Sequence, residues 1–298
     1  MRRVKPLFKS KRGEGEFYKA YDRTLTLWPV PLEEQDVSTS FGSTHVIVSG
    51  SPGSPPLMLF HSAQASSTMW FPNIEALSRD HRVYAVDFIL EAGKSVPRKP
   101  LACRADLTQW LVEILDHYGL EKPGLIGISR GAWNAVALAL SRPERVGALI
   151  LLSPAQALTS ITNLSFVLTS LLSSINPTAR RLAKMTRLAF FNPAGIAPLF
   201  LEQYKCGLRH FNLRYGFSLP PTLFTDDELR SVRALTLLLI GDHDVVNTPA
   251  AVERARNMMS QVDAGIVENA GHILTMDQAG SVNERIVRFL AESVRAKY

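Results

Sequence analysis

The sequence lacks several patterns that define other classes of protein. No stretch approaches the roughly 18 consecutive apolar residues that a membrane span needs, so no transmembrane segment is expected. The basic N-terminal residues are not followed by the apolar region of a secretory signal. No internal repeat and no Walker, GxGxxG, HExxH or CxxC motif is present. The sequence therefore predicts neither a metal site nor a nucleotide cofactor.

Cysteine is also scarce. Cys103 and Cys206 are the only two in 298 residues. Two widely spaced cysteines form neither a disulfide framework nor a zinc-binding pattern. This usage predicts free thiols in a reducing cytoplasm.

Excess positive charge is confined to one short segment. The chain has 33 basic and 27 acidic residues, a net charge of +6. Six cations and no acid fall within residues 1–13: Arg2, Arg3, Lys5, Lys9, Lys11 and Arg12. The remainder is close to neutral, so we predict a disordered basic tail over residues 1–15 and no nucleic-acid partner.

The rest of the chain alternates between apolar strands and amphipathic helices. Residues 36–50 read as a hairpin, and "PLMLFH" (56–61) reads as a buried strand. Further on, "PGLIGIS" runs directly into the helix "RGAWNAVALALSR" (130–142). This alternation predicts an α/β fold, with a mostly parallel sheet covered by helices on both faces.

The alternation is interrupted once. Residues 155–223 contain no convincing strand and read as helices separated by proline turns. We therefore predict a core formed by residues 16–154 and 224–298, with a helical cap inserted over 155–223. Leu168, Leu171, Leu172, Phe190, Phe191 and Phe200 are candidates for an apolar pocket lining within the cap.

The candidate nucleophile is Ser129 in the G-x-S-x-G stretch Gly127–Gly131. A sharp strand-to-helix turn strains the serine backbone and requires small neighbours. A serine needs a base, and the base needs an orienting acid. His272 is the predicted base because it lies in a loop after a predicted strand, and His243 is the weaker candidate.

Two aspartates follow the strand "LLLIG" and compete for the role of the acid. The spacing G-x-x-D from Gly241 selects Asp244, and Asp242 is the fallback, with hydrogen bonding to the turn backbone as its simpler role. Acyl chemistry also needs oxyanion donors. The backbone N–H groups of Arg130 and Ala63 are the predicted pair, and His61 is expected to order the loop that carries Ala63.

Together these residues resemble the α/β-hydrolase superfamily. Several segments in order also resemble bacterial carboxylesterases of the naproxen-esterase type, including "FGSTHVIVSG", "SSTMWFPNIE", "FTDDELR" and "NAGHILTMDQ". The resemblance implies a serine ester hydrolase that uses Ser129, Asp244 and His272 without a metal or organic cofactor. It also implies the inserted cap.

The sequence departs from the family pattern around this motif. Ser62 stands where glycine is usual in the oxyanion loop, charged Arg130 follows the nucleophile, and Ala132 replaces a frequent glycine. The Arg130 side chain has two candidate roles: a structural salt bridge, or selection of an anionic substrate. Gln64 and Trp133 are the predicted substrate-binding side chains.

The predicted activity is hydrolysis of a small, apolar carboxylic ester through an acyl-enzyme. Two alternatives stay open. The same triad could act on a C–C, thioester, lactone or peroxy-acid bond, or the chain could be a non-catalytic binding protein on a hydrolase scaffold. A homodimer is also left open.

Overall fold

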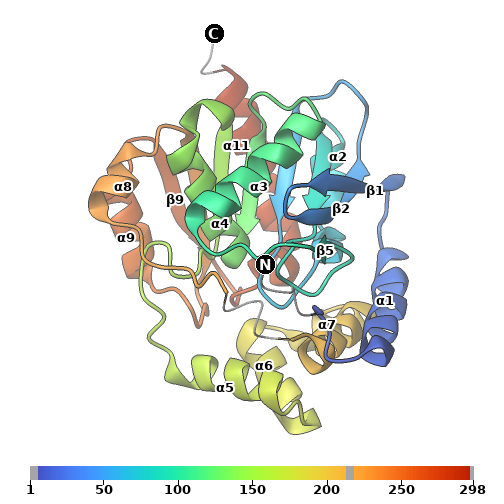
Figure 1. Cartoon of the computed structure of the whole chain (residues 1–298). Coiled ribbons are helices and arrows are strands. Elements are labelled where there is room, and N and C mark those ends of the chain that lie inside the picture. The colour runs from blue at the N-terminus through green and yellow to red at the C-terminus, as the bar shows by residue number, and fades with distance from the viewer. Residues whose placement is uncertain (1–5, 213–217, 296–298) are drawn as a thin grey trace.

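The computed structural model describes residues 6–212 and 218–295, and its centre is one twisted sheet (Figure 1). In this part of the chain the sheet has nine strands, eight of them in the order β1-β2-β4-β3-β6-β7-β8-β9, with β5 paired to β2. The strands are β1 (Leu32–Thr39), β2 (Gly42–Ser49), β3 (Pro56–Phe60), β4 (Arg82–Val86), β5 (Val96–Pro97), β6 (Gly124–Ile128), β7 (Ala148–Leu152), β8 (Leu235–Gly241) and β9 (Val262–Val267).

The sheet is antiparallel at one edge and parallel elsewhere. The β1–β2 hairpin confirms the predicted hairpin, and β2 pairs antiparallel to β4. From β4 to β9 every neighbouring pair is parallel. The central strands are almost continuously apolar because helices bury them on both faces. The predicted α/β fold with a mostly parallel sheet is confirmed.

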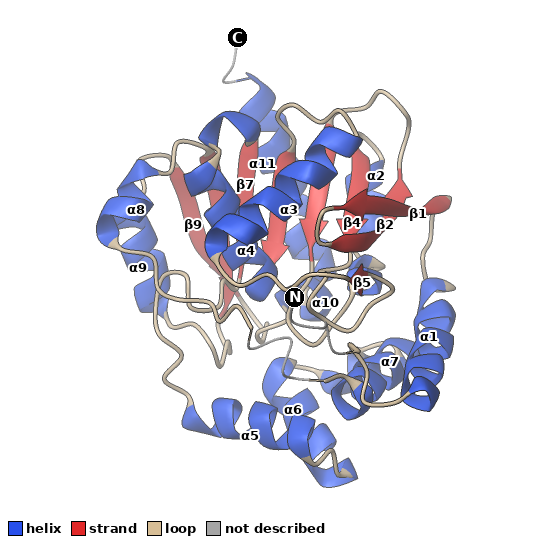
Figure 2. Ribbon diagram, viewed as in Figure 1, coloured by secondary structure: helices blue, strands red, loops and turns tan. Residues whose placement is uncertain are grey.

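Helices cover the two faces of the sheet (Figure 2). α3 and α4 lie over the near face, while α2 and α11 lie behind it. The helices are α1 (Lys11–Leu25), α2 (Ile74–Ser78), α3 (Arg104–His117), α4 (Arg130–Ser141), α5 (Leu164–Ile175), α6 (Ala179–Ala189), α7 (Pro198–His210), α8 (Asp226–Ser231), α9 (Pro249–Met258), α10 (Leu274–Asp277) and α11 (Ala279–Arg295). Among the described residues, no helix is long and apolar enough to cross a membrane.

Between β7 and β8 the chain leaves the sheet and forms α5, α6 and α7. Asn163 and Thr178 cap the first two of these helices by accepting a backbone N–H at their N-termini. The chain returns through α8, which starts with a capping box between Thr225 and Glu228. The division into core and cap stays a prediction, and we call residues 155–223 the cap.

The predicted disordered tail is wrong for residues 6–15. Helix α1 begins at Lys11, and Leu7 and Phe8 are buried. Phe8 also pairs with Phe211, next to α7. The prediction rested on the cations alone. It did not consider that Leu7 and Phe8, which lie among them, could pack against the folded chain. Residues 1–5 of the predicted tail lie outside the described residues.

Candidate active site

Ser129 sits at the junction of β6 and α4 with strained backbone angles, φ 54° and ψ −114°. A Cβ atom on Gly127 would overlap the backbone of Gly131, and one on Gly131 would overlap the carbonyl of Phe60. Only glycine fits at these two positions, because strand and helix approach each other too closely for a side chain. The serine hydroxyl is thereby fixed at the start of a helix, where N–H groups favour negative charge.

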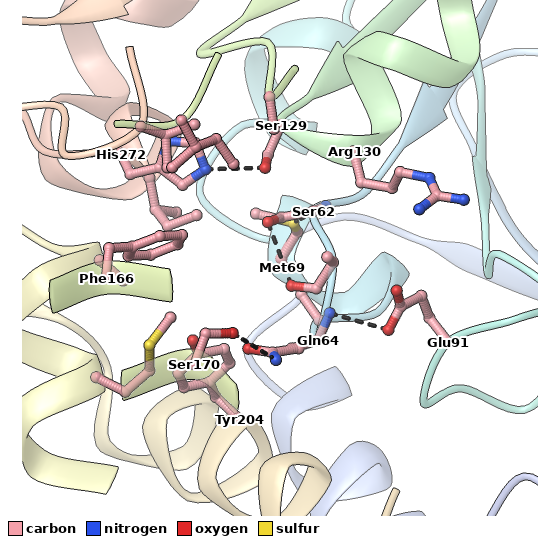
Figure 3. A pocket seen from close by; sticks show the side chains of 18 of the residues that line it. Ser62, Gln64, Met69, Glu91, Ser129, Arg130, Phe166, Ser170, Tyr204 and His272 are labelled. Atoms are coloured by element: carbon pink, nitrogen blue, oxygen red, sulfur yellow. Dashed lines mark hydrogen bonds between the residues drawn. The ribbon is translucent and has the colours of Figure 1, made fainter. Parts of the chain in front are cut away.

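The structure brings Ser129, His272 and Asp244 together at the carboxyl ends of their strands. His272 Nε2 lies 2.8 Å from Ser129 Oγ, and His272 Nδ1 lies 2.9 Å from Asp244 Oδ1. The side chains of His272 and Asp244 are 4% and 0% exposed. Figure 3 shows the imidazole of His272 directed at the hydroxyl of Ser129.

Asp244 is held in place by further hydrogen bonds. Its carboxylate accepts the backbone N–H of Val246 at 2.8 Å and the side-chain amide of Asn247 at 2.9 Å. Burial alone would raise the pKa of Asp244, but the charge and hydrogen bond of His272 and these two donors lower it below its usual range. The carboxylate form, which can orient an imidazole, is therefore favoured.

Asp242 performs a different task. Its carboxylate accepts the backbone N–H groups of Asn269 and Ala270, both at 3.0 Å, in the loop before His272. Burial opposes ionisation, but these bonds and His243 lower the pKa of Asp242 to about 2. His243, the weaker candidate for the base, contacts Asp242 and not Ser129.

The loop after β3 carries the predicted second oxyanion donor. His61 Nδ1 donates to the carbonyl of Ser62 at 2.8 Å, and His61 Nε2 accepts the N–H of Phe88 at 2.8 Å. Burial lowers the pKa of His61, which keeps the ring neutral for this paired role. The backbone N–H groups of Ala63 and Arg130 make no hydrogen bond to a described residue.

The substitution of serine for glycine at position 62 does not place strain there. In the described chain the positive backbone angle of this loop falls on Gln64, with φ 63°. The N–H of Gln64 donates to Glu91 at 3.0 Å, and its side-chain amide donates to Ser170 and Ser174 of α5 at 3.1 and 3.3 Å. Gln64 therefore links the loop to a buried carboxyl on one side and to the cap on the other.

The backbone N–H of Arg130 is a predicted oxyanion donor next to Ser129, but its side chain extends elsewhere. Figure 3 shows the guanidinium pointing away from Ser129. It donates to the carbonyl of Leu219 at 2.5 Å and to Asn134 at 3.3 Å. It also lies 5.3 and 5.5 Å from the ring centres of Phe88 and Trp133.

These contacts identify the Arg130 side chain as a buried anchor for the last part of the cap, which includes Leu219. Burial lowers the pKa of its guanidinium to about 10, and the carboxyl of Glu91 opposes that shift. Arg130 forms no ion pair with a described carboxylate, so of its two candidate roles the structural salt bridge is wrong. Charge-stabilised contacts to a carbonyl and aromatic faces replace it.

The prediction that Trp133 binds substrate is also wrong. The indole is fully buried, stacks on Phe224 with ring centres 5.6 Å apart, and donates to the carbonyl of Thr222 at 2.8 Å. It lies outside the cavity lining formed by described residues. The place of Trp133 in the sequence, shortly after the nucleophile, did not reveal that α4 directs its side chain toward Thr222 and Phe224.

A largely apolar cavity of about 480 Å³ opens beside Ser129 and His272. The core contributes Ala63, Gln64 and Met69, and the cap contributes most of the aromatic lining. Phe190 and Phe200 line it as predicted, whereas Leu168, Leu171, Leu172 and Phe191 are solvent-exposed. Additional cap residues in the wall are Ile161, Phe166, Val167, Met185 and Tyr204.

Two of the wall residues that were not predicted are Phe166 and Glu91. Phe166 lies with its ring centre 6.0 Å from that of His272. Glu91 is buried, and burial raises its pKa to about 7 despite the N–H of Gln64 and the charge of Arg130. An acid within the apolar run "DFILEAG" was the available signal for Glu91.

This fold, with a serine on a strand–helix turn beneath inserted helices, defines a class of hydrolases. A family model described as the alpha/beta hydrolase fold matches residues 55–193. An uncharacterised carboxylesterase, nap, of Bacillus subtilis is 39% identical over 282 residues, covering 92% of this chain and 91% of that protein. Carboxylesterase YbfK of the same organism is 36% identical over 286 residues, covering 94% and 95%.

The solved structures agree. The crystal structure of naproxen esterase from Bacillus subtilis superposes with a TM-score of 0.89 and 36% identity, covering 95% of this chain and 99% of that one. The chain belongs to the α/β-hydrolase family and is a hydrolase. The resemblance to the bacterial carboxylesterases of the naproxen-esterase type is confirmed.

Proposed function

We propose that this protein hydrolyses carboxylic esters through an acyl-enzyme, with Ser129 as nucleophile, His272 as general base and Asp244 as orienting acid. The observation that carries the proposal is the continuous hydrogen-bonded chain from Ser129 Oγ through both nitrogens of His272 to Asp244. The carboxylesterase names of the relatives support an ester as the substrate.

In the first half-reaction, Ser129 Oγ attacks the ester carbonyl carbon while His272 Nε2 accepts the hydroxyl proton. The carbonyl electrons move to oxygen, and the backbone N–H groups of Ala63 and Arg130 stabilise that oxyanion. Each donor contributes on the order of 3 kcal/mol to such a transition state. Collapse breaks the ester bond, and the departing alcohol takes the proton from His272.

In the second half-reaction, water attacks the acyl-enzyme carbonyl while His272 accepts one of its protons. The same two N–H groups stabilise the new oxyanion. The acid then leaves, and His272 returns the proton to Ser129. Asp244 stays ionised throughout and stabilises the imidazolium that forms in each half-reaction.

The cavity supports an apolar substrate. Its wall is mostly aliphatic and aromatic, with polar groups concentrated near Ser129 and Gln64. Burying an apolar group there is favourable by roughly 25 cal/mol for each Å² removed from water. We therefore expect aryl and medium-chain acyl esters to be better substrates than acetyl esters.

The test combines a fluorophosphonate probe with hydrolysis of p-nitrophenyl esters of increasing acyl length. We expect labelling at Ser129 and a fall of at least about a thousandfold in kcat/KM for Ser129→Ala. Ser153→Ala is the control, because that buried serine also has positive φ but lies outside the triad. Full activity of Ser129→Ala would refute the mechanism, and absence of labelling with no hydrolysis of any ester would favour the binding-protein alternative.

A further inference from the structure

Helix α5 exposes an unusual amount of apolar surface. Leu164, Leu168, Leu171, Leu172 and Ile175 recur at helical spacing on one side, and we call these five residues the outer face of α5. Their exposed fractions reach 66% for Leu164 and 65% for Ile175. Over 12 residues this gives an apolar stripe roughly 18 Å long. A stripe of this length on a soluble protein marks an interaction surface.

The opposite side of the same helix is occupied within the protein. Thr169, Ser173 and Ser174 are buried, and Phe166 and Ser170 line the cavity. The outer face is therefore not the hydrophobic side of a helix that has failed to pack. Apart from Phe166 and Val167 at the cavity, the helix places small polar residues inward, and it places its leucines and its isoleucine outward, which is the reverse of an ordinary surface helix.

The neighbouring helix supplies positive charge. α6 packs against α5, and Figure 1 shows the two side by side at the end of the molecule opposite the C-terminus. α6 has four cations and no acid. Arg180, Lys184 and Arg187 are exposed, and within the described chain none of these three forms an ion pair. α5 itself carries no charged residue.

Two kinds of occupant would cover the apolar stripe, and charge distinguishes them. A second copy placed across the outer face by twofold symmetry would bring two cationic α6 helices near one another, which is unfavourable. An anionic lipid surface would bury the leucines at the headgroup boundary and attract the cations. Apolar residues beside lysine and arginine are the composition of helices that lie in such an interface.

We propose that the outer face of α5, together with the cations of α6, docks the protein onto an anionic lipid surface. The helix that lines the cavity then lies at the lipid boundary. Docking itself does not depend on ester hydrolysis, so the two proposals fail separately.

The experiment measures co-sedimentation of the full chain with vesicles of mixed phosphatidylglycerol and phosphatidylcholine, and with pure phosphatidylcholine. We expect binding to the anionic vesicles that weakens as sodium chloride is raised. Leu168→Gln with Leu172→Gln should weaken the partition coefficient about tenfold or more. Lys184→Gln should weaken it about fivefold, since each cation near such a surface contributes about 1 kcal/mol.

Matched controls separate docking from general stickiness. Ile266→Gln changes a similarly exposed apolar residue on β9, and Arg233→Gln removes an exposed cation before β8. Both should bind like the wild type, and all variants should hydrolyse a soluble ester equally if they fold. Equal sedimentation with and without vesicles would overturn the proposal. So would a dimer, seen by light scattering, that the double leucine variant converts to monomer.

Discussion

The core and the cap differ in which side chains they bury: the core buries a charged group, and the cap exposes apolar ones. In the core, the carboxylate of Asp244 is completely shielded from water and satisfied by three donors. In the cap, the outer face of α5 leaves five large apolar side chains in solvent. Burying a charge costs much free energy unless hydrogen bonds in fixed positions compensate it. An exposed leucine needs no such partner.

This difference indicates that the core and the cap have separate roles. The loops at the ends of β6, β8 and β9 hold polar atoms at defined distances, because each loop is tied to a paired strand. The cap supplies shape and apolar surface on both of its sides. Changes in the core should therefore affect the chemical step, and changes in the cap should affect which molecules reach it.

The largest expected effect tests the two loop aspartates against each other. Asp244→Asn should lower kcat for a p-nitrophenyl ester by about 10⁴-fold, because the amide favours the wrong tautomer of His272. Asp242→Asn is the matched control, and it should stay within about tenfold of the wild type while lowering Tm, since Asp242 braces the loop backbone. Equal losses in the two variants would contradict the assignment of the acid.

The next prediction concerns the buried carboxyl of Glu91. Burial raises its pKa from an ordinary value of about 4.3 to about 7, so the neutral form is favoured in the folded state. Its contribution to stability is fully present below about pH 4.3 and is lost as pH rises through 7. The loss amounts to a few kcal/mol, on the order of 3.

Urea unfolding of wild type and Glu91→Gln at about pH 5 and about pH 8 measures this effect. Glutamine can still accept the N–H of Gln64 but does not titrate. The wild type should lose more free energy of unfolding across this interval than the variant loses. Identical pH dependence in the two proteins would show that Glu91 titrates normally.

Arg130→Leu tests the connection between core and cap. The substitution leaves the Leu219 carbonyl without its donor, which costs about 1–3 kcal/mol in a buried setting. Activity should fall by a similar factor on neutral and acidic esters, because the guanidinium points away from Ser129. Arg130→Lys should lose less stability, since it keeps a donor. Selective loss on acidic esters would instead assign the guanidinium to substrate recognition.

The smallest effect compares the two sides of α5. Phe166→Ala removes apolar wall beside His272 and should lower kcat/KM for a medium-chain ester about tenfold, with less effect on an acetyl ester. Leu168→Ala, on the outer face, should leave hydrolysis of a soluble ester unchanged. A similar loss in both variants would mean that the outer face also contacts substrate.

Much of the core could be predicted from sequence because its patterns are local. Continuous apolar strands next to amphipathic helices identify a parallel sheet, and the glycines around Ser129 identify a tight turn. Chain order then favoured His272, and the spacing from Gly241 selected Asp244. The structure brings both together with Ser129. Their catalytic roles stay predictions until the variants are measured.

The cap and the N-terminal segment were harder to predict because their burial depends on distant partners. Periodicity marks Leu168 and Phe166 alike as helical apolar residues, yet one faces solvent and the other faces the cavity. Trp133 was assigned to the pocket by proximity in sequence, but its partner Thr222 is far along the chain. Leu7 and Phe8 lie within a run of cations, so the local sequence did not indicate that they are buried.

The backbone of Ser129 is tied to the segment that follows β7. Its N–H donates to the carbonyl of Leu152 at 2.8 Å, and its own carbonyl accepts the N–H of Ala155 at 3.3 Å. The turn cannot relax to ordinary backbone angles while β7 remains in the sheet. We therefore expect the strained serine and the central strands to form one cooperative unit, whose amide hydrogens exchange with solvent only through global unfolding.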